Sequence, residues 1–272
     1  MKFTVKPGWR RALLQGLGLL VLSWLALQLF WFTRIAVMTT IDPHSTSFER
    51  SEIWRLLTEK HRLPWSQQWR DYDVISDQLK RAVIASEDAN FSEHSGVEWE
   101  AIEKAWERNQ KAEARADKVN EAIERREKQA QARAQNRGAT PPAPTRRVKA
   151  SIFGGSTITQ QLAKNLFLSG ERSILRKGQE FLITFMLEAM LDKSRILEIY
   201  LNHVEWGEGV FGAEAAAHHY FQTEARRLGP GQAAKLAVML PAPKRFEKTP
   251  QSAYLSGRSA TVVARMPAVD LP

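Results

Sequence analysis

The longest stretch without a charged residue is mainly apolar and lies near the N-terminus of the chain. Residues 12–33 are mainly Leu, Val, Trp and Phe and contain no charged side chain. A helix of this length spans about 30 Å, the thickness of one hydrocarbon core, so the pattern predicts a transmembrane helix. A cleaved signal peptide is the competing interpretation. Its apolar region would be shorter and would end in small residues, whereas this one ends in aromatic residues.

The charges that flank this segment predict its orientation. Lys2, Lys6, Arg10 and Arg11 precede it, and only Arg34 follows closely. Cytoplasmic flanks carry the excess of Lys and Arg. We therefore expect the N-terminus in the cytoplasm and the rest of the chain beyond the outer face of the membrane.

After this anchor the apolar positions recur at helical spacing, and an alternation with period two is sustained nowhere. The pattern predicts a mainly α fold. The expected organisation is a cytoplasmic N-terminus (1–11), a transmembrane helix (12–33), one domain (34–250) and a loosely ordered tail (251–272).

Two regions of the domain stand apart in composition. Residues 107–150 are rich in Glu, Lys, Arg, Ala and Gln and then in Pro, so we expect an inserted segment that is a solvated helix or flexible. Trp54, Trp65 and Trp69 lie among charged residues. We interpret them as core residues, and a surface close to the membrane is the alternative.

Overall composition narrows the possible partners. The 272 residues, 43% of them hydrophobic, suffice for one full-sized domain, and the net charge of +9 favours a polyanionic partner. Because the bulk of the chain is expected outside the cytoplasm, we expect lipid or lipid-linked phosphate, not nucleic acid. The absence of Cys excludes disulfides and thiolate zinc sites, and the six His residues lack metal-binding spacing.

A candidate base stands at the end of an apolar helical stripe. Glu87 follows Val83 by four residues and Ile84 by three. Burial against apolar neighbours raises the pKa of a glutamate, which is how proteins make a working base from this residue. An acidic pair at a fraying helix end, Glu87 with Asp88, is the alternative interpretation.

A glycine pair followed by polar residues at helical spacing predicts an anion-binding site. Ser156 or Thr157 can cap the helix that follows, and the first amides of a helix attract anions. A capped amphipathic helix with a solvated polar stripe is an equally good interpretation of this motif alone. The polar side chains that share one face are Gln161, Lys164 and Asn165.

The next helix begins with a charged cluster and then becomes apolar almost all round, over residues 181–187. Such a helix is typical of a buried position. The charges could be ordinary surface pairs, but their place at the entrance of a buried helix favours a site. The cluster consists of Arg172, Arg176, Lys177 and Glu180.

The chain resembles monofunctional biosynthetic peptidoglycan glycosyltransferases, relatives of the glycosyltransferase domain of bifunctional penicillin-binding proteins. The resemblance covers about residues 50–106 and 150–250. In this family the connection that the charged insertion occupies is normally shorter, so no role is carried over to Arg147 or Lys149. The motifs, in the family's order, are 87–96, 154–165, 176–180, 193–202 and 207–221.

This resemblance implies a lysozyme-like α fold that polymerises lipid II into glycan strands. It implies Glu87 as the general base and Glu180 as a second acid of uncertain role. Lys164, Arg172 and Lys177 would stabilise the leaving pyrophosphate, and Gln161 and Asn165 would orient oxygens. Arg176, Ser156 and Thr157 complete the expected substrate-binding set.

The resemblance also sets expectations for cofactor, partners and place. We expect no tightly bound cofactor and no dedicated metal site, with Mg²⁺ compatible with the substrate pyrophosphate. The expected partners are lipid II, the growing glycan strand, the membrane and other cell-wall synthesis proteins. The expected place is the bacterial inner membrane, with the catalytic domain in the periplasm. A glycoside hydrolase on the same scaffold and a non-enzymatic cell-wall scaffold are the alternatives.

Overall fold

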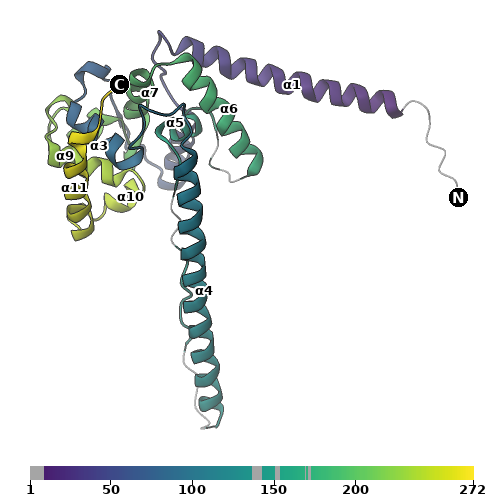
Figure 1. Ribbon diagram of the computed structural model, residues 1–272, viewed down its shortest axis with the longest axis vertical. Coiled ribbons are helices and arrows are strands. Elements are labelled where there is room, and N and C mark those ends of the chain that lie inside the picture. Colours follow the sequence, from purple (N-terminus) through teal and green to yellow (C-terminus); the bar gives the residue numbers. More distant parts are fainter. Residues whose placement is uncertain (1–8, 137–142, 151–153, 169, 171–172) are drawn as a thin grey trace. The chain divides into compact units, whose positions relative to one another are not determined.

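The computed structural model describes residues 9–136, 143–150, 154–168, 170 and 173–272. The chain divides into two units, residues 98–156 and the remainder. The described part is mainly helical, as predicted (Figure 1). The α-helices are α1 (Trp9–Val37), α2 (Ser47–Arg55), α3 (Asp77–Glu87), α4 (Trp99–Asn136), α5 (Ile158–Phe167), α6 (Ile174–Met190), α7 (Lys193–His203), α8 (Ala213–Phe221), α9 (Pro230–Met239), α10 (Pro243–Phe246) and α11 (Ala253–Arg265). Short π or 3₁₀ turns are Leu56–Lys60, Tyr72–Val74, Ala225–Arg227 and Met266–Ala268, and the strands are β1 (Ser66–Gln67), β2 (Glu205–Gly207) and β3 (Val210–Phe211).

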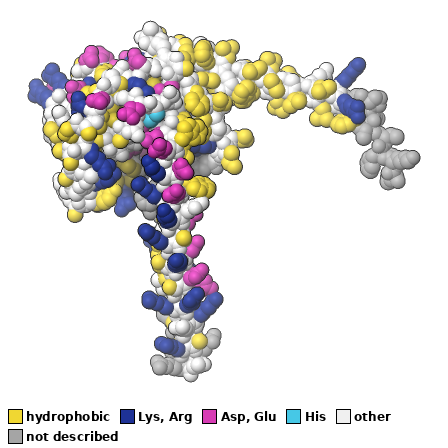
Figure 2. Space-filling view, viewed as in Figure 1, with side chains coloured by type: hydrophobic (Ala, Val, Ile, Leu, Met, Phe, Trp, Pro, Cys, Tyr) yellow, Lys and Arg dark blue, Asp and Glu magenta, His cyan; other side chains and the backbone are white. Residues whose placement is uncertain are grey.

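Helix α1 contains the predicted transmembrane segment and extends beyond it at both ends. Among the described residues it is the one helix long and apolar enough to cross a membrane. Most of its apolar side chains are exposed (Figure 2), whereas Trp31 and Ile35 near its C-terminal end are buried in the core. Near its C-terminal end α1 packs on α6, where the amides of Gln28 and Gln179 exchange two hydrogen bonds of 3.1 Å.

The core of the first unit is formed by helices from distant parts of the chain. Helices α3, α9 and α11 pack side by side (Figure 1), and α5 packs on both α6 and α7. Fully buried side chains such as Leu79, Ile158 and Leu236 join these helices into one apolar cluster. The interpretation of the tryptophans as core residues is wrong for Trp54, which is 70% exposed. Trp65 and Trp69 are half-buried, and Trp65 stacks on Phe211.

The C-terminal segment corrects one prediction. Residues 251–272 were expected to be loosely ordered, yet they contain α11, which Ser252 caps by accepting a hydrogen bond from the Leu255 amide. Leu255, Val262 and Met266 are buried in the main core. Their spacing places them on one face, and burial of that face against α9 holds the segment in place.

The first unit also contains a small three-stranded sheet. Strand β3 lies between β1, to which it is parallel, and β2, to which it is antiparallel. Gly209 in the β2–β3 turn has φ +76°, and a Cβ there would lie 1.7 Å from the Pro64 carbonyl oxygen. Only glycine fits this turn.

The second unit consists of one long helix and an extended segment that returns along it. Helix α4 carries basic and acidic side chains along its exposed surface (Figure 2), as the composition predicted. The Asn120 side chain binds both the carbonyl and the amide of Val148, at 2.9 and 2.8 Å. The Glu127 carboxylate accepts a hydrogen bond from the Thr145 amide. These contacts pair residues 143–150 with the helix.

Candidate active site

The candidate base, Glu87, is the last residue of α3. The helix begins at a Ser76 cap, and its apolar stripe through Val83 and Ile84 is buried. The carboxyl group therefore emerges where the helix leaves the core. Burial is the largest influence on Glu87 and raises its pKa, as the sequence predicted.

A chain of hydrogen bonds from two other helices ends on this carboxylate. Gln161 of α5 donates from Nε2 to Glu87 Oε2 at 2.9 Å, and Tyr200 of α7 donates from its hydroxyl to Gln161 Oε1 at 3.0 Å. Tyr200 is fully buried. Because its hydroxyl occupies the amide oxygen, the Gln161 amide nitrogen faces Glu87 and stabilises the charged form of the carboxylate.

Asp88, the neighbour of Glu87, joins the first motif to the start of α5. One carboxylate oxygen accepts from the Ile158 amide at 2.9 Å, and the other lies 2.8 Å from His94 Nε2. Asp88 is 4% exposed. The acidic pair is therefore not frayed, because Asp88 is held inside the fold directly after the last residue of α3.

Thr157 and Gly96 complete this junction. The Thr157 hydroxyl accepts from the Gln160 amide, forming a capping box, and donates to the Gly96 carbonyl at 2.6 Å. Gly96 has φ +83°, and a Cβ there would lie 2.7 Å from side-chain atoms of Thr184 and Glu188. Thr157, expected to contact substrate, thus uses its hydroxyl to hold α5 against the Gly96 loop.

The second acid, Glu180, is in the opposite environment. It is 3% exposed, and Arg176 binds one of its carboxylate oxygens at 2.9 Å while Lys177 forms a close ion pair with the other. Arg176 and Lys177 precede it on α6 by four and three residues, which places all three on one face. The Ser173 side chain caps the helix by accepting from the Arg176 amide.

Lys164 connects the two acids. Partial burial lowers the pKa of Lys164. The negative charge of Glu180 and, more weakly, that of Glu87 raise this pKa and so oppose the effect of burial. Its side chain still reaches solvent. Lys164 is therefore within electrostatic range of both carboxylates, and its ammonium forms no hydrogen bond or ion pair with another described residue.

Three predicted residues remain, and the structure describes two of them, Asn165 and Ser156. Asn165 is half-buried on α5, and its amide forms no hydrogen bond with another described residue. Ser156 is the last residue of the second unit and is placed only within that unit. Arg172 lies outside the described residues.

The roles of three residues at the site were not identified from the sequence. They are Tyr200, which binds Gln161, Asp88, which binds the start of α5, and Arg258. Tyr200 lies on α7, within the 193–202 motif, to which no role was assigned from the sequence. Arg258 lies on α11, in the segment expected to be loose. Glu87 has its pKa raised first by burial, and the positive charge of Arg258 acts weakly against that rise. No local pattern pointed to either residue, because both reach the site only through tertiary packing.

The described site residues favour an anion over a divalent cation. Both oxygens of Glu180 are already paired with cations, and Glu87 accepts an amide hydrogen bond. Protein magnesium sites use free carboxylate oxygens. Glu180 offers none, and Glu87 offers one, because the amide of Gln161 binds only its Oε2. Lys164, Lys177 and Arg176 supply positive charge suited to phosphate oxygens.

Together the fold and the site indicate one class of enzyme. Its members have an apolar anchor helix and a helical domain in which a partly buried acid lies beside a group of cations. The chain belongs to the transglycosylase family, whose sequence model, described as Transglycosylase, matches residues 56–117 and 139–267. Residues 118–138, between the two matched stretches, fall within the predicted insertion.

Relatives of nearly full length are similar to this chain. A biosynthetic peptidoglycan transglycosylase of Paraburkholderia xenovorans (strain LB400) is 47% identical over 267 residues, which is 98% of this chain and 96% of the relative. One of Burkholderia thailandensis is 47% identical, covering 99% and 91%. One of Bordetella pertussis is 48% identical over 245 residues, covering 90% and 88%.

Proposed function

We propose that this protein is a peptidoglycan glycosyltransferase that polymerises lipid II into linear glycan strands. The observation that carries the proposal is the place of α5, which packs on α6: its Gln161 binds Glu87, and its Lys164, three residues further on, lies in electrostatic range of Glu180 and Glu87. It joins a candidate base to a cationic site for a leaving pyrophosphate. The names of the similar proteins, biosynthetic peptidoglycan transglycosylases, support the same substrate class.

In the proposed reaction Glu87 takes the proton from the 4-hydroxyl of the acceptor sugar. The oxygen then attacks the anomeric carbon of the donor from the face opposite the pyrophosphate, and the bond to the pyrophosphate oxygen breaks with inversion. The products are a lengthened glycan and polyprenyl pyrophosphate. The raised pKa of Glu87, caused chiefly by burial, makes it a stronger proton acceptor than an exposed glutamate.

The cations act on the departing group. Lys164 and Lys177 stabilise the negative charge that grows on the pyrophosphate, and Arg172 is expected to do so too. Glu180 holds Arg176 and Lys177 in a fixed arrangement. Gln161 and Asn165 orient substrate oxygens. A magnesium ion that arrives with the pyrophosphate is compatible with this site, but no step requires a tightly bound cofactor.

The anchor supports the same proposal. Helix α1 would lie in the bacterial inner membrane with the N-terminus in the cytoplasm and the catalytic domain in the periplasm. A substrate with a long polyprenyl tail remains in the bilayer. A tethered enzyme meets it at a high effective concentration, which lowers the cost of bringing the two together.

The test is turnover of labelled lipid II by the purified full chain in detergent, with products resolved by size. Glu87→Gln is expected to lower polymer formation by about a thousandfold or more, in the range that loss of a general base produces. The matched control is Glu93→Gln, an exposed acid of the same motif, which should keep nearly full activity. Moenomycin, the inhibitor expected for this family, should block the wild type.

Two results would overturn the proposal. Unchanged polymer formation in Glu87→Gln would remove the base from the mechanism and favour a scaffold. Release of short soluble sugars from finished glycan, without consumption of lipid II, would identify a hydrolase that uses water as the attacking group.

A further inference from the structure

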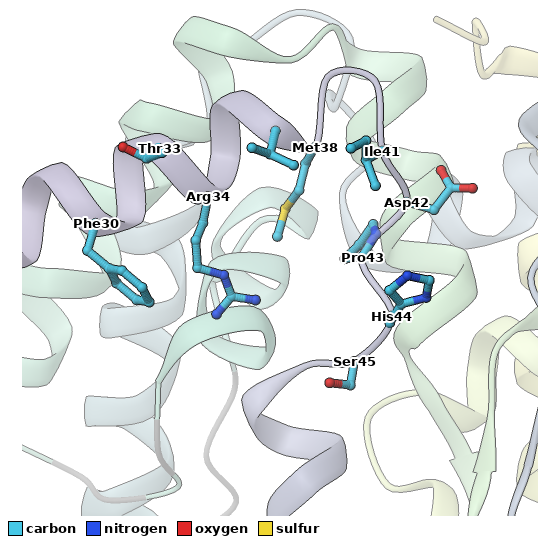
Figure 3. A pocket seen from close by; sticks show the side chains of 10 residues that line it. Phe30, Thr33, Arg34, Met38, Ile41, Asp42, Pro43, His44 and Ser45 are labelled. Carbon is cyan, nitrogen blue, oxygen red and sulfur yellow. The ribbon is translucent and has the colours of Figure 1, made fainter.

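A cavity of about 410 Å³ lies beside the end of α1, on the side of the loop that leads to α2 (Figure 3). Its wall is formed by the last two turns of the helix and by residues 38–45. Half of the lining side chains are apolar, and they are Phe30, Val37, Met38, Ile41 and Pro43. Arg34 is the cation among the residues that line it.

Arg34 keeps its hydrogen-bonding capacity free. Its guanidinium lies 5.8 Å from the centre of the Phe30 ring and 5.1 Å from that of Phe167. It forms no hydrogen bond or ion pair with another described residue. A guanidinium offers five N–H donors in a planar fork, so an anion with several oxygens would satisfy what the aromatic rings cannot.

The acid in the cavity does not neutralise Arg34. Asp42 lines the same space, but its carboxylate forms a 2.8 Å ion pair with Arg195. Arg50 donates to Ser45 Oγ at 2.9 Å, which adds a second positive charge next to the lining. The cavity therefore has an apolar wall and a positive electrostatic character.

The place of the cavity on the anchor indicates the source of the anion. The preceding residues of α1 expose apolar side chains such as Leu25, Leu27 and Leu29, as a lipid-facing helix does. Phe30 and Arg34 then follow within the last turns, where a membrane helix leaves the hydrocarbon for the headgroup layer. An apolar wall beside a cation at this depth matches the glycerol and phosphate of a phospholipid.

We propose that this cavity binds the headgroup phosphate of an anionic membrane phospholipid, of the phosphatidylglycerol type, through Arg34. The proposal rests on the membrane position of α1, which is part of the proposed function, but not on the reaction. The lipid is not the substrate. The catalytic residues lie on α3, α5 and α6, whereas the cavity belongs to α1 and the 38–45 loop.

One contact links the two sites. Phe167, under the Arg34 guanidinium, is the last residue of α5, the helix that carries Gln161 and Lys164. A phosphate on Arg34 would fix the guanidinium over this ring. The bound lipid would thus hold the anchor helix against the helix that carries much of the candidate site.

The experiment measures retained lipid on the purified full chain by native mass spectrometry, without lipid II. The probes are dioleoyl phosphatidylglycerol and dioleoyl phosphatidylcholine, which share tails and differ in headgroup charge. The wild type should retain one phosphatidylglycerol in preference to phosphatidylcholine. Arg34→Gln should weaken this retention about tenfold, the effect of losing one charged hydrogen-bonding partner. Arg34→Lys, which keeps the charge without the fork, should be intermediate.

The matched control is Arg10→Gln, because Arg10 is an exposed arginine at the other end of the same helix. Its lipid retention should equal that of the wild type. Equal retention by wild type and Arg34→Gln would overturn the proposal, as would equal losses in both arginine variants, which indicate a general charge effect. Equal retention of the two lipids would remove the selectivity for anionic headgroups.

A competition arm separates the lipid site from the substrate site. Lipid II is added to the Glu87→Gln protein carrying phosphatidylglycerol. Retention of both lipids supports the proposal, and displacement of one by the other would assign the cavity to the substrate. Because retention is measured without turnover, the lipid site can fail while polymerisation is intact, and the reverse can also be observed.

Discussion

The two acids of the candidate site, Glu87 and Glu180, have contrasting surroundings. Around Glu87 the protein supplies apolar surroundings and one amide donor, and no described cation forms an ion pair with it. Around Glu180 it supplies two cations, one on each oxygen. The first environment disfavours the charged form, and the second depends on it.

This difference assigns separate tasks to the two acids. A carboxylate whose surroundings raise its pKa gains stability when it accepts a proton, so Glu87 suits proton transfer. A carboxylate bound by Arg176 and Lys177 would lose both partners on protonation. Glu180 therefore suits the positioning of positive charge, and this was the role that the sequence left open.

The largest expected effect comes from breaking the ion-paired region. Glu180→Gln leaves Arg176 and Lys177 without their buried anion and should lower the free energy of unfolding by about 2 kcal/mol, below the full buried-pair value because Lys177 is partly exposed. Urea denaturation in detergent measures this. The control is Glu100→Gln, which breaks the exposed Lys104 pair at the same helical spacing and should cost almost nothing. Equal losses would mean that the burial of Glu180 has no energetic role.

The same substitution at Glu87 should have the opposite sign. Burial raises the pKa of Glu87 above the ordinary value of 4.5, so the stability that its protonated form contributes is present below 4.5 and is lost as pH rises through the folded-state pKa. Glu87→Gln should therefore raise the melting temperature at about pH 8 and have little effect at about pH 4. A lower melting temperature at the higher pH would show that the carboxylate is stabilised in its charged form.

Local pattern was sufficient for those parts of the site that lie within one helix. The position of Glu87 at the end of an apolar stripe, the Thr157 cap and the spacing of Arg176, Lys177 and Glu180 all follow from helical periodicity. The mainly α fold and the anchor helix were predictable for the same reason. Each of these features depends on residues that are close in the sequence.

The contacts between helices could not be predicted in this way. Gln161 reaches Glu87 across 74 positions and Tyr200 reaches Gln161 across 39. Arg258 lies on α11, in the C-terminal segment. The apolar stripe of this segment is short, and only its packing against α9 shows that the segment belongs to the core. Residues such as these act through tertiary packing, which leaves no local period in the sequence.

The smallest effects should come from the hydrogen-bond chain that keeps Glu87 usable as a base. Burial raises the pKa of Glu87, and the Gln161 amide opposes that rise by donating to the charged form. Gln161→Met removes the donor, so the pKa should rise further and the acid limb of the kcat/KM profile should move to higher pH. Loss of substrate contacts would lower the whole profile without moving this limb.

Tyr200→Phe tests the outer member of the chain at a distance from substrate. Tyr200 donates to the Gln161 oxygen, which keeps the amide nitrogen directed at Glu87. Without this hydroxyl the amide can rotate, so the acid limb should move in the same direction as in Gln161→Met but by less. Adding Tyr200→Phe to Gln161→Met should then produce no further movement, because the oxygen that Tyr200 binds is already absent. Independent, additive shifts would mean that Tyr200 influences Glu87 by a route other than Gln161.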